Sequence, residues 1–351
     1  MLIEIFRKDD GMVTKIGLDL GYANITISDT AAGVYREQSI ALIDKDSRRI
    51  ISVGDSSTEK AEQLGDQAIL VRPFKNGILF DRQITESVIS HVTGSLPKGD
   101  RIRCAIGVPS DLMQKQEKEI FDILSSLGID DCFAVNRSVA ALIGAGETPL
   151  QTIISVNVGA SSTEIAVFNE GELIYTHKES VGGEDFDKAV RQYISDQGGV
   201  NVSLSVARDI KEQLGSVWQG KEEQTVEIEG ILALTGNKVK MTISSEDIVG
   251  VFERSLHRLL MSIAVAVKEI PLESVDKALK NGIVLTGGGA MIHGLDLMIE
   301  KVLGVSVKMP EDPIDSVAKG LAVINTRIPV KGRGMKKNVS DTIASLYRDK
   351  M

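Results

Sequence analysis

Cysteine and histidine are scarce in this chain: its 351 residues include two cysteines and four histidines. Cys104 and Cys132 each lie in an apolar run, and they form no Cys-x-x-Cys pair. The histidines are scattered, so the sequence shows no metal-binding signature. We expect two buried, free thiols in a reducing cytoplasm rather than a disulfide framework or a zinc site.

Long hydrophobic runs are absent as well. No apolar stretch reaches the roughly 18–20 residues that a membrane-spanning helix needs. The N-terminus also lacks a secretory pattern, because Glu4, Arg7 and Asp9 interrupt any apolar core. We therefore expect a soluble, intracellular protein.

The chain lacks an excess of positive charge, and its formal net charge is -9. This acidic balance argues against general nucleic-acid binding, which needs a basic surface. It does not exclude a nucleotide-binding pocket, because a few local groups determine whether a nucleotide binds there. The length of 351 residues exceeds what one hydrophobic core usually reaches, so two domains are expected.

One pattern occurs twice: a β run, a turn that contains glycine, and a second β run. The copies cover residues 15–27, with Gly21 in the turn, and residues 152–167, with Gly159 in the turn. Their similarity and separation predict a duplicated domain, with one copy opening each half of the chain.

Elsewhere, predicted strands and helices alternate as they do in α/β layers. We expect strands at 102–108, 132–135 and 282–286, and a β region at 225–244 that turns at Gly236-Asn237. The helical spacing of apolar residues predicts helices at 111–127, 138–146, 183–195, 205–217 and 245–268. Ser138 is expected to cap the second of these helices, and Ser244 or Ser245 the last.

The glycine turns suit a phosphate group. A tight turn between strands presents consecutive backbone N–H groups to an anion, and glycine lets the anion approach closely. Asp19, just before Gly21, has the position of a carboxylate that holds hydrated Mg²⁺ against phosphates. On its own, one such turn is explained more readily by a plain hairpin. Two copies, followed by Gly287-Gly288-Gly289 after a β run, favour a nucleotide, with the third cluster packing on adenine or ribose.

Three motifs, in this order, carry a family resemblance: Asp19-Leu20-Gly21, Asn157-Val158-Gly159 and Thr286-Gly287-Gly288-Gly289. They resemble the phosphate-1, phosphate-2 and adenosine motifs that actin, sugar kinases and heat-shock chaperone ATPases share. Further stretches resemble the MreB-like bacterial actins in particular, namely 71–79, 108–110, 140–146, 181–187, 285–295, 312–313 and 317–320. The resemblance runs from about Lys15 to Asn325, which makes it far more specific than any single motif.

The resemblance implies an α/β, actin-like ATPase fold in which two related domains, each with a smaller subdomain, flank a nucleotide cleft. We expect a leader at 1–13, domain I at 14–150 with subdomains IA and IB, and domain II at 151–320, where IIA carries IIB at about 183–246. The chain then returns to IA at 321–330, and a basic linker and C-terminal helix follow at 331–351.

The resemblance also implies that ATP or ADP binds with Mg²⁺, which Asp19 is expected to hold through water. Arg208, Lys211 and Glu212 are expected along the ribose and adenine, although these residues by themselves show only a helix with charged and apolar faces. The expected nucleotide-binding residues are Asp19, Gly21, Tyr22, Ala23, Asn24, Gly159, Ala160, Ser161, Ser162, Gly182, Gly183, Arg208, Lys211, Glu212, Gly287, Gly288, Gly289 and Met291.

Two departures from the family pattern bear on ATP hydrolysis, and they put substituted residues, Asn136 and Asn157, at catalytic positions. Asn157 stands where the family usually has Asp, so it offers an uncharged oxygen to Mg²⁺ or water. Asn136-Arg137-Ser138 aligns with a Glu-Glu-Pro in which one Glu positions the attacking water. Losing such groups costs roughly a few orders of magnitude in rate, so we predict weak or absent hydrolysis. Arg137 is open to two interpretations, a contact with the γ-phosphate or a surface salt bridge.

The leading hypothesis for function is an MreB-like subunit that polymerises with itself and serves cell shape or intracellular organisation. A non-polymerising adaptor of the pilus-assembly or cell-division type is an alternative; the altered Asn157 and Asn136-Arg137 favour it slightly, whereas the stretch at 182–244, as subdomain IIB, argues against it. A magnetosome- or plasmid-positioning filament is another alternative. A sugar or acetate kinase needs a catalytic carboxylate in a substrate pocket and larger insertions, and the sequence shows neither.

The two ends of the chain leave alternatives open. Apolar residues crowd the leader, and residues 1–8 either contact the inner face of the cell membrane weakly, as in many MreB-like proteins, or pack as an ordinary leader. Residues 340–350 predict a short helix that is either solvated or docks on a partner protein or a neighbouring subunit.

Overall fold

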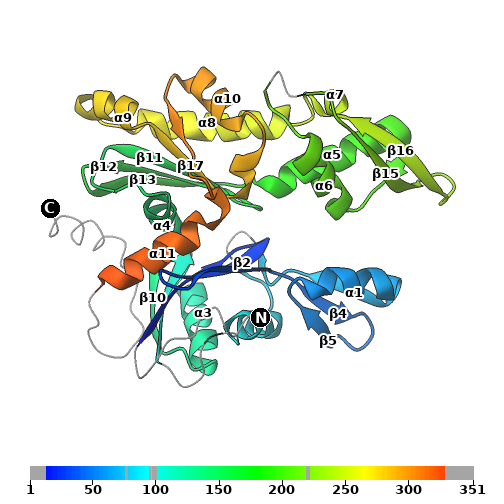
Figure 1. Ribbon diagram of the computed structural model, residues 1–351, viewed down its shortest axis with the longest axis horizontal. Coiled ribbons are helices and arrows are strands. Elements are labelled where there is room, and N and C mark those ends of the chain that lie inside the picture. Colours follow the sequence, from blue (N-terminus) through cyan, green and yellow to red (C-terminus); the bar gives the residue numbers. More distant parts are fainter. Residues whose placement is uncertain (1–12, 76–77, 95, 97–100, 219–221, 329–351) are drawn as a thin grey trace.

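The computed structural model describes residues 13–75, 78–94, 96, 101–218 and 222–328. Two large β-sheets with their helices form two halves, and helices α4 (Arg137–Gly144) and α11 (Ser316–Arg327) lie between them (Figure 1). The expected leader at 1–13, apart from its last residue, and the whole of the basic linker and C-terminal helix at 331–351 fall outside the described residues.

The two large sheets have the same topology, which confirms the predicted duplication. In each, three antiparallel strands are followed across the sheet by two parallel ones, in the orders β3-β2-β1-β9-β10 and β13-β12-β11-β17-β18. The first sheet consists of β1 (Thr14–Leu20), β2 (Asn24–Asp29), β3 (Gly33–Gln38), β9 (Ile102–Val108) and β10 (Asp131–Asn136). The second consists of β11 (Ile153–Val158), β12 (Thr163–Asn169), β13 (Glu172–Glu179), β17 (Ile283–Thr286) and β18 (Val307–Lys308).

Smaller sheets extend each half. The order β5-β4-β6 joins β4 (Ala41–Asp44), β5 (Ile50–Val53) and β6 (Ala68–Val71), and β7 (Phe74–Lys75) pairs with β8 (Ile78–Leu79). The order β14-β15-β16 joins β14 (Val200–Asn201), β15 (Thr225–Leu232) and β16 (Lys238–Ser244). The remaining helical elements are α1 (Ser56–Leu64), η2 (Gly65–Gln67), α2 (Arg82–Thr93), α3 (Gln114–Ser126), α5 (Gly183–Gly198), α6 (Leu204–Leu214), α7 (Ser245–Ile248), α8 (Glu253–Lys268), η3 (Leu272–Ser274), α9 (Val275–Asn281), η4 (Gly288–Met291), α10 (Leu295–Leu303) and η5 (Pro313–Asp315).

Within the described residues, three hydrophobic clusters hold the fold together, one in each half and one between them. Strands β10 and β11 are buried along their whole length, as expected of strands covered on both faces. The third cluster joins α4 and α11 to Phe133 of the first sheet and Phe168 of the second. These two helices are therefore the packed layer through which the halves meet.

Two glycines let α4 and α11 cross at very short range. A Cβ atom added at Gly144 would lie 1.8 Å from the carbonyl oxygen of Ser316, and one added at Gly320 would lie 1.8 Å from that of Ala140. Any side chain at either position would force the helices apart. Helix α11 also runs unbroken across the boundary expected at 320/321, and the expected domain boundaries stay predictions.

Several predicted elements have other limits in the structure. The single helix expected at 245–268 is wrong: α7 and α8 are separated at 249–252, where Gly250 has φ +83, a left-handed conformation that favours glycine. Ser244 caps α7, accepting from the backbone N–H of Asp247. Helix α3 begins at Gln114 rather than at residue 111, whereas β9 and the β15–β16 hairpin match their predicted ranges.

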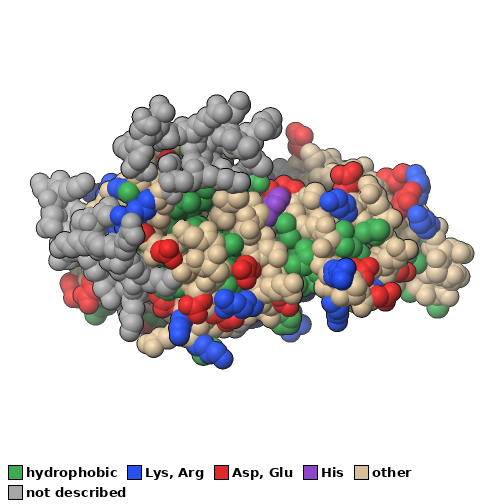
Figure 2. Space-filling view, turned by 90° about the horizontal axis from the view of Figure 1, so that it is seen from below, with side chains coloured by type: hydrophobic (Ala, Val, Ile, Leu, Met, Phe, Trp, Pro, Cys, Tyr) green, Lys and Arg blue, Asp and Glu red, His purple; other side chains and the backbone are tan. Residues whose placement is uncertain are grey.

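Cys104 and Cys132 are buried and free, as predicted, on neighbouring parallel strands. No helix among the described residues is long and apolar enough to cross a membrane. On the face shown in Figure 2, acidic and basic side chains are interspersed rather than gathered by sign.

Candidate functional site

Two equivalent hairpin turns carry the first two predicted motifs. The β1–β2 turn covers residues 21–23 and the β11–β12 turn covers 159–162. A Cβ atom at Gly21 would lie 2.5 Å from the carbonyl oxygen of Asn24, so only glycine allows this turn. The second turn is closed by the backbone N–H of Gly159, which donates to the carbonyl of Ser162 at 2.9 Å.

The second turn packs on the N-terminus of helix α5. The backbone N–H of Gly183 donates to Gly159 at 2.9 Å, and that of Glu184 donates to Ala160 at 2.8 Å. A Cβ atom at Gly182 would lie 2.6 Å from the backbone nitrogen of Ser162. The structure thus brings Gly182 and Gly183 beside the turn, and the helix N-terminus adds a favourable field for an anion there.

The third motif packs on the end of β11. Gly287 has φ +86, and a Cβ atom there would lie 2.3 Å from the carbonyl oxygen of Val158 and 2.7 Å from Oδ1 of Asn157. A Cβ atom at Gly289 would lie 2.4 Å from Cγ1 of Val158. Both glycines are therefore required by the protein's own packing. Gly288 is the exposed member of the motif, and Met291, at the end of η4, is exposed as well.

Arg137, the first residue of α4, joins the two turns. Its Nε donates to Oδ1 of Asp19 at 3.0 Å, and its Nη2 donates to the carbonyl oxygen of Leu20. Its Nη1 lies 3.9 Å from Oε1 of Glu164, on β12 of the second sheet. The predicted salt bridge exists, but it is not on the surface, because the side chain of Arg137 is only 11% exposed.

The charges around Arg137 shift its pKa and that of Glu164. Burial lowers the pKa of the Arg137 guanidinium, but attraction to Asp19 and then Glu164 more than offsets this, and the net shift is upward. The side chain of Glu164 is 3% exposed, and burial raises its pKa to about 7 despite the nearby Arg137. Glu164 pairs in register with Asn157 across β11 and β12, so it lies at the second turn as Thr26 does at the first.

Asn136 has a structural role at the start of α4. Its Oδ1 accepts from the backbone N–H of Ser138 at 2.8 Å and from that of Val139 at 3.4 Å. It is therefore the N-cap of the helix, and the prediction that Ser138 caps it is wrong. Asn157 is 9% exposed, and its Oδ1 accepts from Oγ1 of Thr286 at 3.3 Å. Neither amide offers a carboxylate for catalysis.

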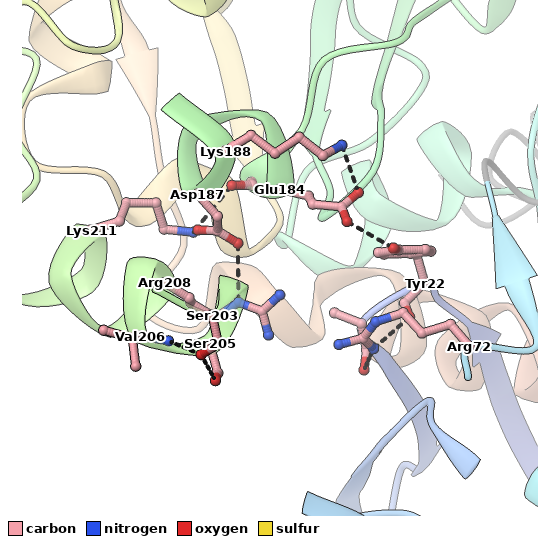
Figure 3. A network of polar contacts seen from close by, with 12 residues as sticks. Tyr22, Arg72, Glu184, Asp187, Lys188, Ser203, Ser205, Val206, Arg208 and Lys211 are labelled. Atoms are coloured by element: carbon pink, nitrogen blue, oxygen red, sulfur yellow. Dashed lines mark hydrogen bonds and ion pairs between the residues drawn. The ribbon is translucent and has the colours of Figure 1, made fainter. Parts of the chain in front are cut away.

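Helices α5 and α6 are joined by a buried charge that the sequence did not reveal. Asp187 is 1% exposed, and its carboxylate lies 2.6 Å from Nζ of Lys211 and 3.2 Å from Nε of Arg208. Figure 3 shows both basic side chains reaching back from α6 to Asp187. Lys211 also donates to the carbonyl of Gly183 at 3.3 Å, which ties α6 to the N-terminus of α5. Glu212 is exposed on the same helix.

A hydrogen bond also spans the two halves directly. The hydroxyl of Tyr22, in the first turn, donates to Oε1 of Glu184 on α5 at 3.0 Å (Figure 3). Burial, followed by the charge of Glu184, raises the pKa of Tyr22. Arg72 donates to the carbonyls of Tyr22 and Ala23 at 3.0 and 3.2 Å, and its guanidinium lies 5.0 Å from the centre of the Tyr22 ring. Arg72 thereby fixes the backbone of the first turn.

Most of the expected site residues lie at the two turns, at the N-terminus of α5 or at the 287–289 cluster. The sequence prediction missed four participants. Arg72, Glu184 and Asp187 fall inside the stretches 71–79 and 181–187 that carried the resemblance, and that signal could have identified them. Glu164 lies outside the stretches that carried the resemblance, and only its position just after the second turn could have suggested a role for it.

Comparison with known proteins decides the family. A family model described as MreB/Mbl protein matches residues 13–331. The chain belongs to the MreB/Mbl family. This membership confirms the predicted class, a bacterial actin-like cytoskeletal protein, and the expected actin-like fold.

Individual MreB and Mbl proteins are similar over most of their length. The cell shape-determining protein Mbl of Bacillus cereus is 27% identical over 315 residues, covering 88% of this chain and 95% of the relative. The cell shape-determining protein MreB of Escherichia coli is 27% identical, covering 90% and 94%. Among solved structures, MreB5 of Spiroplasma citri bound to ADP matches with a TM-score of 0.85 at 21% identity, covering 90% of this chain and 97% of that one. The MamK double helical filament matches with a TM-score of 0.77 at 20% identity, covering 91% of this chain and 100% of that one. At these identities, the two structures show similarity of fold alone.

Proposed function

We propose that this MreB/Mbl chain binds ATP or ADP between its two hairpin turns, polymerises with itself into filaments, and hydrolyses ATP weakly or not at all. The observation that carries the proposal is the juxtaposition of the two equivalent turns, joined by Arg137 and by the bond from Tyr22 to Glu184. Solved structures of the same fold include MreB5 of Spiroplasma citri bound to ADP and the MamK double helical filament, which supports nucleotide binding and polymerisation.

The phosphates would lie between the turns at 21–23 and 159–162, with Gly182 and Gly183 beside them. The adenosine would lie along the exposed residues Gly288 and Met291 of η4, and near Arg208 on α6. The side chain of Arg208 is 29% exposed although it pairs with Asp187, so part of it faces outward. In this arrangement Asp187 holds Arg208 and Lys211 in place for the nucleotide.

Weak hydrolysis follows from what occupies the catalytic positions. Asn136 is committed to capping α4, and Asn157 accepts a hydrogen bond from Thr286. Neither amide is a base, and a guanidinium cannot serve as one because it keeps its proton. The attacking water therefore lacks a carboxylate to orient it at these two positions. Since general-base assistance contributes ~10²–10⁴-fold to such reactions, its absence predicts slow turnover.

Mg²⁺, which was expected on Asp19, does not fit the residues present. Oδ1 of Asp19 already accepts from Nε of Arg137, which sets a fixed positive charge where the ion would bind. Asn157 adds no charge. Within the described part of the chain, no group of three or more His, Cys, Asp or Glu residues is placed to hold a metal ion.

Two finer expectations concern residues outside the described part of the chain. We propose that residues 1–8 contact the inner face of the cell membrane, weakly for one subunit and more firmly for a filament that presents many copies. Co-sedimentation with anionic vesicles tests this, and deletion of residues 1–8 should abolish it. We also propose that the helix expected at 340–350 docks on a partner protein or a neighbouring subunit, and that the protein is cytoplasmic.

Pelleting and negative-stain microscopy of the purified protein test the function. The protein is compared with ATP, a non-hydrolysable analogue, ADP and no nucleotide, while phosphate release is followed in parallel. Filaments with ATP and the analogue, with little phosphate released, are expected. Nucleotide binding without filaments in any state would overturn polymerisation and favour the non-polymerising adaptor.

A further inference from the structure

The carboxylate that precedes the first turn already has a cation beside it. Nε of Arg137 lies 3.0 Å from Oδ1 of Asp19, and Nη2 of the same guanidinium donates to the carbonyl of Leu20, one residue before the turn. Arg137 is the first residue of α4, so the packing of this helix fixes the position of its backbone. The pair of Asp19 and Arg137 carries no net formal charge.

The positive charge of Arg137 is permanent. Arginine is not deprotonated in proteins, and its planar group of five N–H donors matches phosphate oxygens. The hydrogen bonds to Asp19 and Leu20 use two of these donors. Nη1 lies 3.9 Å from Glu164, beyond hydrogen-bonding distance, so the guanidinium retains donors for a further anion at the junction of the two turns.

A divalent ion at the same place would meet repulsion rather than ligands. It would approach within a few ångströms of a guanidinium in a partly buried site, where like charges interact strongly. Asn157 contributes an amide whose oxygen already accepts from Thr286. Glu164, on the second sheet, lies 3.9 Å from Nη1 of Arg137, and its side chain is 3% exposed. The local chemistry thus favours one cation, and the chain supplies it.

We propose that Arg137 serves as the built-in cation of this site, so that the chain binds nucleoside di- and triphosphates in their metal-free form. Arg137 neutralises phosphate charge beside the first turn in place of a divalent ion, and nucleotide affinity is independent of Mg²⁺. This inference rests on the proposed function, because it requires a nucleotide between the turns.

Calorimetric titration of the full chain with ATP and with ADP, after removal of any bound nucleotide, tests the inference. Each titration is done in excess EDTA and in excess MgCl₂. We expect the two dissociation constants of the wild type to agree within about twofold. Arg137→Gln should weaken binding in EDTA by about tenfold or more, since a charge-assisted bond to phosphate is lost. In that variant Asp19 is freed, so MgCl₂ should restore part of the affinity.

Two further variants separate this role from a structural one. Arg137→Lys keeps the charge and should retain metal-independent binding better than Arg137→Gln. Arg101→Gln removes a comparable ion pair, with Asp131, at the opposite end of β9 and should change neither affinity nor its response to Mg²⁺. Thermal unfolding of each variant establishes that it folds.

The outcomes distinguish this inference from the proposed function. Wild-type binding that is lost in EDTA and restored by MgCl₂ would overturn the built-in cation and leave nucleotide binding intact. Arg137→Gln binding that remains tight and insensitive to metal would also overturn it. Failure of the wild type to bind ATP or ADP in both conditions would overturn the proposed function and this inference together.

Discussion

Nε of Arg137 donates to Oδ1 of Asp19 at 3.0 Å, although 118 residues separate them in the chain. This bond joins the carboxylate that the sequence assigns to Mg²⁺ with a residue that replaces part of the expected Glu-Glu-Pro. Arg137, at a position where the resemblance predicts an acid, is therefore the residue that donates to Asp19. We infer that this one substitution affects both the orientation of water and the binding of Mg²⁺ at Asp19.

Acids introduced at Asn157 and Arg137, two of the three altered positions, should restore hydrolysis. We expect Asn157→Asp combined with Arg137→Glu to raise Mg²⁺-dependent phosphate release by on the order of 10²-fold, because Asp19 is freed and a carboxylate can orient water. Single-turnover phosphate release measures this. Asn157→Asp alone leaves Arg137 on Asp19 and should gain little. A double variant no faster than wild type would show that other residues limit turnover.

The hydrogen bond from Tyr22 to Glu184 should hold the two halves together at the turns. Tyr22→Phe removes it, and we expect a loss of about 1 kcal/mol in the free energy that opposes local opening. Hydrogen exchange should become faster at the β1–β2 turn and at the N-terminus of α5. Tyr193→Phe, which removes a bond to Asp247 within the second half, should leave exchange at the β1–β2 turn unchanged. Equal exchange there in Tyr22→Phe and wild type would contradict the inter-half role.

The close crossing of α4 and α11 should tolerate no side chain. Gly320→Ala puts a Cβ atom 1.8 Å from the carbonyl oxygen of Ala140, and we expect it to destabilise the protein by about 3 kcal/mol or more. Chemical denaturation measures this. Gly198→Ala, also within a helix, meets its nearest neighbours at an ordinary 3.4 Å and should be neutral or slightly stabilising. Similar midpoints for the two variants would contradict the packing described.

Glu164 should make stability depend on pH. Burial raises the pKa of Glu164 from 4.5 to about 7, so between these values the folded state binds a proton that the unfolded state has released. This contribution to stability is complete below about pH 4.5 and is lost as pH rises through 7. Glu164→Gln should therefore gain stability over wild type as pH rises, by up to on the order of 3 kcal/mol. Denaturant midpoints from pH 4 to 8 measure this. Glu227 is exposed, so the denaturant midpoint of Glu227→Gln should change with pH as that of wild type does. A difference in stability between Glu164→Gln and wild type that stays constant with pH would refute the raised pKa of Glu164.

Local patterns in the sequence predicted the repeated strands, the turns and many elements well. Strand β9 and the β15–β16 hairpin match the alternation and turn residues that predicted them. The break between α7 and α8 was missed because apolar residues keep a helical spacing on both sides of it, whereas the backbone leaves the helix at the extended Val249 and the left-handed Gly250. The cap of α4 was misplaced because Asn136 and Ser138 are both good capping residues, and the end of β10 decides between them.

Partners of buried charges were beyond prediction from the sequence. The motifs named Arg208 and Lys211 but gave no reason to pair them with Asp187, since that contact depends on how α5 and α6 pack. The same is true of Arg137, whose partners come from β1 and β12. Spacing along the chain identifies candidate residues, whereas the tertiary fold sets which charges remain available to a ligand.

The nucleotide content of filaments tests the account most directly. The protein is polymerised with ATP, the filaments are pelleted and washed, and the bound nucleotide is released and separated by chromatography. We predict about one nucleotide per subunit, predominantly unhydrolysed ATP, with little phosphate in the supernatant. Filaments that contain mainly ADP, with a matching amount of released phosphate, would contradict weak hydrolysis, and filaments without nucleotide would contradict the site itself.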